Sequence, residues 1–195
     1  MLVVGFLKMR MCRESPKIGQ GTYSNVYKAR DLITGKIVAL KKVRVDTLEP
    51  ENVKFMAREI LILKKLNHVL VIKLKGLVTS RMSSSLYLVF EYMEHDLAGL
   101  AATQGVKFTE SQLLSGLDHC HKNGVLHRDI KGSNLLIDND GIYKIADFGL
   151  ACFYDPQNKQ PMTSRVVTLW YRPLVSHPNR WRKHRDETNK LLKTT

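Results

Sequence analysis

The sequence contains few cysteines, few acidic residues and no long hydrophobic run. Its three cysteines, Cys12, Cys120 and Cys152, are odd in number and widely spaced, which argues against a disulfide framework and fits a reducing compartment. The apolar start, residues 1–7, is too short to cross a bilayer. Basic residues follow this stretch instead of preceding it, so a signal peptide is not expected. We therefore expect a soluble protein of the nucleus or cytoplasm that binds no membrane.

The shortage of acidic residues leaves a large positive charge. The 195 residues include 31 basic and 18 acidic side chains, which gives +13. Such a charge favours anionic partners such as phosphates, unless the basic residues are simply spread over a solvated surface, as their scatter along the chain indicates. No motif interleaves them with aromatic residues, so direct nucleic-acid binding is not expected.

A zinc site is also not expected. The triplet His119-Cys120-His121 has the right residue types, but adjacent side chains cannot all point at one ion, and no second ligand pair has suitable spacing. We interpret this triplet as structural.

The first half of the chain indicates a small sheet that carries one helix. Residues 18–29 are typical of a strand, a glycine turn and a second strand, and Thr34-Gly35 is the expected turn into a strand over residues 36–45. A further strand is expected over residues 86–92. The apolar residues of the predicted helix, residues 51–66, recur at helical spacing: Val53, Met56, Ile60, Leu63 and Leu66.

From Asp96 onward the pattern changes to helix and loop. A helix containing Leu113 and Leu117 is expected to end near Asn123-Gly124, a typical C-terminal cap. Short strands are expected at residues 125–126, 135–137 and 143–145, with a hairpin turn at residues 139–141. A boundary between two lobes is expected near residues 92–96.

The most informative stretch combines His127-Arg128-Asp129-Ile130-Lys131-Gly132-Ser133-Asn134 with Asp147-Phe148-Gly149. It brings two carboxylates, a lysine and an asparagine into one short segment. Such a set suits the holding of metal-bound ATP and the removal of a proton from a hydroxyl group.

Two upstream features suit the same chemistry. The turn from Gly19 to Ser24 has the pattern Gly-x-Gly-x-x-Ser, whose backbone could approach phosphate oxygens, although a plain hairpin turn has the same pattern. Lys41, in Val38-Ala39-Leu40-Lys41, could neutralise phosphates. Its natural partner is Glu59, on the predicted helix.

Taken together and in this order, these motifs resemble the eukaryotic protein kinases, from about Lys17 to Pro173. The segments 88–93, 52–60 and 168–173 resemble the cyclin-dependent kinase group, in particular plant members related to the transcriptional cyclin-dependent kinases. The resemblance implies an α+β, two-lobed fold with a small antiparallel sheet and one helix in the first lobe. It also implies the following division: a divergent segment 1–16, a first lobe 17–94, a partial, mostly helical second lobe 95–173, and an unrelated basic tail 174–195.

The resemblance also implies roles for individual residues. Asp129 would accept the substrate's proton, and Lys131 would steady the migrating phosphoryl group of a serine/threonine kinase. Lys41 and Glu59 would form the ion pair at the ATP phosphates, and Asn134 and Asp147 would bind Mg2+. The other residues at the nucleotide would be Ile18, Gly19, Gly21, Val26, Ala39, Phe90 as gatekeeper, Glu91 and Met93 at the hinge, Asp96 at the ribose, and Leu136. The apolar members of this set would pack in a core even in an inactive protein.

Regulation is implied as well. Thr163 matches the activation-loop phosphorylation site, whose phosphate Arg58 and Arg128 would grip. The third arginine position of the family holds Cys152 here. Thr22 and Tyr23 match inhibitory sites, although both could be unmodified turn residues.

The sequence departs from the family pattern in two places. About two turns of helix are missing near Leu114, and residues 174–195 do not continue the pattern, so we expect a truncated second lobe of marginal stability. Two hypotheses therefore stand. One is a cyclin-dependent serine/threonine kinase that uses ATP and Mg2+, binds a cyclin and acts on protein Ser/Thr residues followed by Pro; the other is a catalytically silent fragment that binds nucleotide or cyclin.

Overall fold

The computed structural model describes residues 11–12, 17–20, 24–44, 49–80, 85–101 and 110–155. The expected site residues Gly21, Thr22, Tyr23 and Thr163 lie outside these ranges, as does the expected basic tail.

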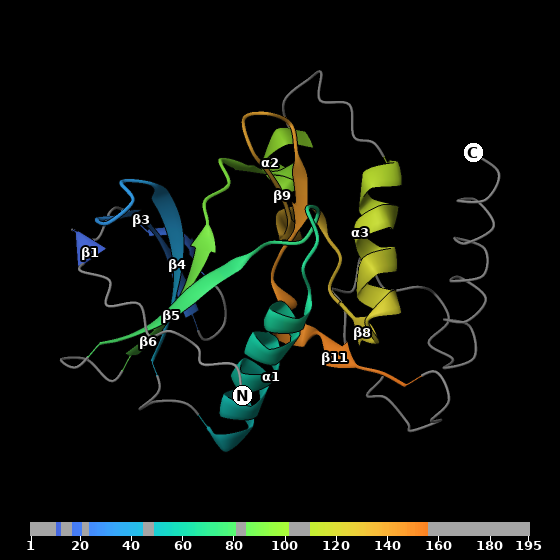
Figure 1. Cartoon of the computed structure of the whole chain (residues 1–195), viewed down its shortest axis with the longest axis horizontal. Helices are drawn as coiled ribbons and strands as arrows, with labels where there is room; N and C mark the ends of the chain where they lie inside the picture. The colour runs from blue at the N-terminus through green and yellow to red at the C-terminus, as the bar shows by residue number, and fades with distance from the viewer. Residues whose placement is uncertain are drawn as a thin grey trace.

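A six-stranded antiparallel sheet forms the first part of the molecule (Figure 1). Its strand order is β1-β3-β4-β6-β5, and β2 also pairs with β3. The strands are β1 (Met11–Cys12), β2 (Lys17–Gln20), β3 (Ser24–Asp31), β4 (Ile37–Arg44), β5 (Leu74–Ser80) and β6 (Ser85–Glu91). The strands expected from the sequence are confirmed, whereas β1 and β5 were not foreseen.

The turn between β3 and β4 forms as the sequence predicts. The Asp31 carboxylate accepts hydrogen bonds from the Ile33 N–H at 2.9 Å and from the Thr34 hydroxyl at 2.6 Å. Gly35 has φ 70°, a left-handed conformation that glycine adopts without steric penalty. These bonds fix the register in which β4 carries Lys41 along the sheet.

Helix α1 (Pro50–Lys65) confirms the predicted helix, and Pro50 stands in its first turn. The predicted apolar face is partly wrong. Val53 is exposed, whereas Glu59 and Ile62 are buried together with Leu63. The spacing of the apolar residues predicts an inward-facing Val53, but the buried side of the helix carries Glu59, which pairs with Lys41 of the sheet, together with Ile62 and Leu63.

The remaining elements follow the hinge between the two lobes. They are β7 (His95–Asp96), α2 (Leu97–Ala101), α3 (Glu110–Lys122), β8 (Val125–Leu126), η1 (Gly132–Asn134), β9 (Leu135–Ile137), β10 (Tyr143–Ile145), η2 (Phe148–Leu150) and β11 (Cys152–Phe153). The predicted short strands, the end of the helix and the hairpin turn are confirmed; Gly124 and Gly141 have φ 66° and 78°. The hairpin β9–β10 and the pair β8–β11 are antiparallel.

One apolar core joins the two parts. It includes Ile62 and Leu63 of α1, Cys120 of α3, Ile145 of β10 and Phe148 of η2. Close packing holds α3 against β10, because a Cβ added to Gly116 would stand 2.9 Å from Ile145 Cδ1. Figure 1 shows α1 between the sheet and α3. The loops that carry the catalytic motifs are therefore anchored in this core.

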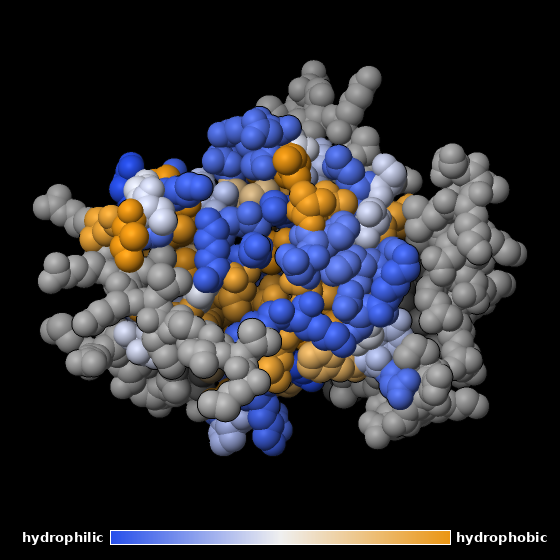
Figure 2. Space-filling model, viewed as in Figure 1, coloured by the Kyte–Doolittle hydropathy of each residue, from blue (hydrophilic) through white to orange (hydrophobic). Residues whose placement is uncertain are grey.

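The described surface on the face drawn in Figure 2 is mostly hydrophilic, with hydrophobic residues visible between the polar ones. No helix in the described ranges is both long enough and apolar enough to pass through a membrane.

Candidate active site

Lys41 connects three elements of the structure. Its Nζ lies 2.7 Å from Oε1 of Glu59 on α1 and 3.2 Å from Oδ1 of Asp147, which precedes η2. The expected pair of Lys41 and Glu59 thus forms. The side chains of Lys41 and Glu59 are only 17% and 7% exposed, while that of Asp147 is 51% exposed. The ammonium group therefore joins a buried carboxylate to an accessible one.

The contacts between Lys41 and Asp147 favour the charged form of each. Burial alone would lower the pKa of Lys41, but the negative charges of Glu59 and Asp147 outweigh it, so the pKa is raised. Burial alone would raise the pKa of Asp147, but the charge and the hydrogen bond of Lys41, helped by His127 and the Gly149 N–H, together outweigh it, so the pKa is lowered. At neutral pH Asp147 is a carboxylate with exposed oxygens, which is the form that a hard cation binds.

Asp129 is held by its neighbours along the catalytic loop. Its Oδ2 lies 2.9 Å from Lys131 Nζ and accepts a hydrogen bond from Asn134 Nδ2 at 3.0 Å. The same amide nitrogen donates to the Asp129 backbone carbonyl at 2.9 Å. Both bonds use the nitrogen of Asn134, so its amide oxygen points away from Asp129 and can serve as an oxygen ligand. Asp129 and Asn134 are both buried.

His127 ties this loop to the loop of Asp147. Its Nδ1 accepts the Asp129 N–H at 3.2 Å, and its Nε2 lies 2.9 Å from the Ala146 carbonyl oxygen. Because Nδ1 accepts, Nε2 carries the proton and donates. The hydrogen bond to Ala146 would raise the pKa of His127, but burial outweighs it and lowers the pKa. The ring is therefore neutral at neutral pH. Its edge packs on Phe148, with ring centroids 4.6 Å apart.

Two non-glycine residues in these loops have left-handed backbones. Arg128 has φ 70° and Asp147 has φ 58°, a conformation that is unfavourable for residues with a Cβ. Phe148 is 1% exposed and anchors the strained peptide in the core, while the Ala146 N–H donates to the Asn134 carbonyl at 2.9 Å. The chain is therefore forced to turn Asp147 toward Lys41 and toward the Asn134 loop.

The residues expected around an adenine ring line up along neighbouring strands. Ala39 of β4 pairs with Phe90 of β6, and Val26 of β3 pairs with both Gly19 and Lys41. Phe90, Met93 and Leu136 are partly buried against the common core. Ile18 is 48% exposed, and Gly19 packs against Val26. The strand pairings thus place Val26, Ala39 and Phe90 close to Lys41 along the sheet.

Asp96 and Glu91 make side-chain contacts that the sequence did not foresee. Asp96 pairs with Leu136 in the sheet β7–β9 and accepts the Gly99 N–H at 2.8 Å, which caps α2. Oδ1 of Asp96 is therefore engaged in the N-terminal cap of α2. The Glu91 carboxylate forms an ion pair with Lys144 and accepts a hydrogen bond from the Lys73 N–H. The sequence predicted no role for Lys144, because only this contact with Glu91 distinguishes it from other lysines in strands.

The expected regulatory residues are only partly described. The guanidinium of Arg58 lies over the ring of Phe55, 4.9 Å from its centroid, and Arg128 stands next to Asp129 with its left-handed backbone. Since Thr163, Thr22 and Tyr23 lie outside the described residues, the phosphate clamp stays a prediction.

The donor set fits Mg2+ bound to a triphosphate. Within the described ranges, no cluster of three or more His, Cys, Asp or Glu residues could hold a metal ion by itself. Asp147 and Asn134 would supply two oxygen ligands, from loops joined by the Ala146–Asn134 hydrogen bond. Mg2+ is usually bound in this way, through one or two protein oxygens plus substrate phosphates.

Comparisons with known proteins show the family to which the chain belongs. Residues 12–178 match the protein kinase domain. The chain is 74% identical over 163 residues to a probable serine/threonine-protein kinase of Arabidopsis thaliana, a match that covers 80% of this chain and 28% of the relative. It is 61% identical over 173 residues to Cyclin-dependent kinase C-2 C of the same plant, with 85% and 27% covered. It is 52% identical over 180 residues to Cyclin-dependent kinase C-1 of Oryza sativa subsp. japonica, with 80% and 34% covered.

The chain thus spans about a quarter to a third of the length of these curated relatives. The match to the domain, in contrast, takes in most of the 195 residues. With its catalytic loops arranged as described, the chain belongs to the protein kinase domain family.

Proposed function

We propose that this chain forms the ATP-binding and catalytic region of a serine/threonine protein kinase of the cyclin-dependent type. The observation that carries the proposal is the position of Lys41, which bonds Glu59 and Asp147 at the same time. The Lys41 ammonium group therefore lies beside the Asp147 carboxylate, which would bind Mg2+. The phosphates of ATP need both a lysine and a bound metal ion for charge neutralisation. The names of the relatives, serine/threonine-protein kinase and cyclin-dependent kinase, support the same class.

The proposed division of labour is the one that the family resemblance implies, and the contacts of Lys41, Asp147, Asp129 and Asn134 support it. Lys41, fixed by Glu59, would hold the α- and β-phosphates. Asp147 and Asn134 would bind Mg2+, which supplies charge neutralisation at the phosphates when bound. Ile18, Gly19, Val26, Ala39, Phe90, Glu91, Met93, Asp96 and Leu136 would enclose the adenine and ribose, with Gly21 in the preceding turn. Residues 17–94 would form the first lobe and residues 95–173 the second.

Asp129 would act on the second substrate. Its carboxylate is oriented by Lys131 and Asn134, so it could accept the proton of a Ser or Thr hydroxyl as that oxygen attacks the γ-phosphorus. Lys131, 2.9 Å from Asp129 Oδ2, could reach the transferred phosphoryl group from the same side. The proposed substrates are protein Ser/Thr residues followed by Pro. The proposed partner is a cyclin, with Thr163, Arg58 and Arg128 forming the phosphorylated activation site and Thr22 and Tyr23 as inhibitory sites.

Transfer of labelled phosphate tests the proposal. The chain is incubated with a partner cyclin, Mg2+, γ-labelled ATP and matched peptides that contain Ser-Pro or Ala-Pro. We expect label on the Ser-Pro peptide only, and its loss in Asp147→Asn and Asp129→Asn. Lys122→Met is the matched control, because Lys122 pairs with Asp118 on the exposed side of α3. Nucleotide binding without any transfer would favour the silent binding module instead.

A further inference from the structure

The Glu91 side chain joins three segments that meet behind the hinge. Its Oε1 accepts the Lys73 N–H at 2.9 Å and lies 3.0 Å from Lys144 Nζ. Glu91 ends β6, Lys73 precedes β5, and Lys144 stands in the middle of β10. We call Lys73, Glu91 and Lys144 the Glu91 junction. Its two charged side chains are largely buried, with 22% of Glu91 and 13% of Lys144 exposed.

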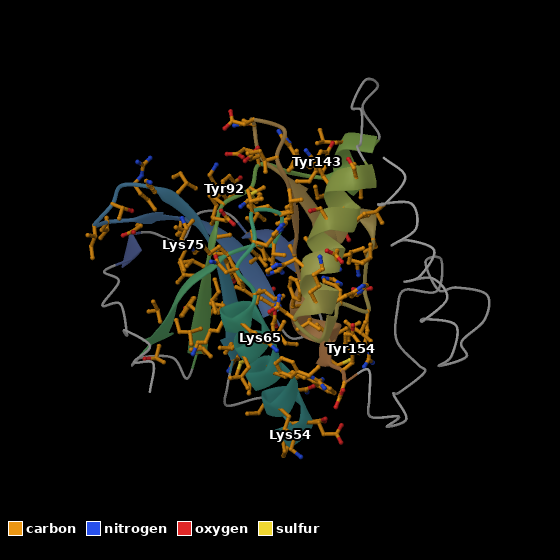
Figure 3. The ribbon with its side chains drawn as sticks, turned by 45° about the vertical axis from the view of Figure 1, so that its right-hand side comes forward. Lys54, Lys65, Lys75, Tyr92, Tyr143 and Tyr154 are labelled. Atoms are coloured by element: carbon orange, nitrogen blue, oxygen red, sulfur yellow. The ribbon has the colours of Figure 1, made fainter. Side chains whose placement is uncertain are left out.

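Backbone bonds make the junction part of a continuous connection. The Ile145 N–H donates to the Leu70 carbonyl, and the Ile72 N–H donates to the Ile145 carbonyl, both at 2.9 Å. Val71 and Ile145 form a parallel bridge. Residues 70–72 therefore run beside β10, and the junction closes the corner where this segment, β6 and β10 come together. Figure 3 shows Tyr92 and Tyr143, the neighbours of Glu91 and Lys144, in the same upper part of the molecule.

The junction lies at the adenine end of the proposed nucleotide site, and the chain that follows Lys144 leads from it to the metal end. Glu91 is itself one of the hinge residues whose backbone would meet adenine, while its side chain points into the junction. Lys144 pairs with Leu136 across the β9–β10 hairpin and is three residues before Asp147, at the phosphate end. Since one ion pair fixes β6 to β10, it also fixes the spacing between the adenine end and the metal end.

We propose that Glu91 and Lys144 are positioning residues that hold the adenine and phosphate subsites in register, so that one ligand engages both at once. This inference rests on the proposed function, because it assumes that a nucleotide binds. Two linked groups bind more tightly than either alone only when both subsites are held at the correct spacing. Loosening the junction should therefore weaken the binding of Mg·ATP, which must engage both subsites, more than it weakens the binding of adenosine, which engages one.

Calorimetric titrations of the full chain with adenosine and with Mg·ATP test this. The quantity measured is the ratio of the two dissociation constants, Kd(adenosine)/Kd(Mg·ATP). Glu91→Gln keeps the size of the side chain and an acceptor for the Lys73 N–H but removes the charge. Lys144→Met removes the other partner. We expect the ratio to fall about tenfold in both, the order of coupling between groups in direct contact.

Two further variants separate positioning from general destabilisation. Lys144→Arg retains the ion pair and should keep the wild-type ratio. Lys122→Met breaks the 2.7 Å ion pair with Asp118 on α3 and should also leave it unchanged. A folded Glu91→Gln or Lys144→Met variant with the wild-type ratio, or with both ligands weakened equally, overturns the inference alone. A folded wild-type chain that binds neither ligand overturns the proposed function, and this inference with it.

Discussion

Replacing Lys41 by Met leaves the Glu59 carboxylate in the core without its cation. Glu59 is 7% exposed on its side chain and bonds Lys41 at 2.7 Å, so few water molecules can replace the lost ammonium group. Removal of one partner from a buried ion pair destabilises a protein by about 3–5 kcal/mol. Lys41 keeps 17% of its side-chain surface in contact with solvent, so we expect a loss of about 2–4 kcal/mol in the free energy of unfolding.

Denaturation by urea, followed by circular dichroism, measures this loss. The double variant Lys41→Met/Glu59→Gln removes the uncompensated charge as well, and should recover at least half of the stability lost in Lys41→Met. Glu59→Gln alone should cost less, since Lys41 keeps its contact with Asp147 at 3.2 Å. A loss below about 1 kcal/mol in Lys41→Met, the range of surface ion pairs, would refute the view that this pair is buried and structural.

Three further outcomes follow from the packing and the charges. Between pH 7 and pH 5 the chain should lose stability, because burial lowers the pKa of His127 in the folded state. Below the ordinary pKa of 6.5, the unfolded chain then binds more protons than the folded chain. When the free energy of unfolding is measured with urea at several pH values, it should fall less steeply with decreasing pH in His127→Gln than in the wild type. Burial raises the pKa of the Cys120 thiol to about 12, so mass spectrometry after alkylation at pH 8 should find Cys120 unmodified until the protein is denatured. Gly116→Ala should lower the free energy of unfolding by about 1–3 kcal/mol, despite the better helix propensity of alanine, because the new Cβ would stand 2.9 Å from Ile145 Cδ1; an unchanged midpoint of denaturation would contradict this packing.

The local structure could be predicted where short-range chemistry decides it. The turns at Gly35, Gly124 and Gly141 follow from the need for a positive φ. The strands around the catalytic loops also end where the pattern places them. In contrast, β5 was missed, because residues 74–80 show no clear alternation of apolar and polar residues.

The site could be predicted as a set of residues but not as a set of contacts. Motif order identified Lys41, Glu59, Asp129, Asn134 and Asp147, and the structure joins Lys41 to Glu59 and Asp147, and Asp129 to Asn134. Spacing along one chain cannot reveal a contact between strands that are distant in sequence. For this reason the sequence indicated no role for Lys144, which lies fifty-three residues after Glu91. The exposed position of Val53 was also not foreseen.

In the proposed function, Lys41, Asp147 and Asn134 surround one metal–triphosphate group. A crystal structure of the chain with Mg2+ and a non-hydrolysable ATP analogue tests it most directly. We expect a metal ion bound by oxygen atoms of Asp147, Asn134 and the phosphates, at about 2.0–2.1 Å, with Lys41 Nζ against the same phosphates. A nucleotide bound elsewhere, or a metal ion that contacts neither Asp147 nor Asn134, would contradict the account.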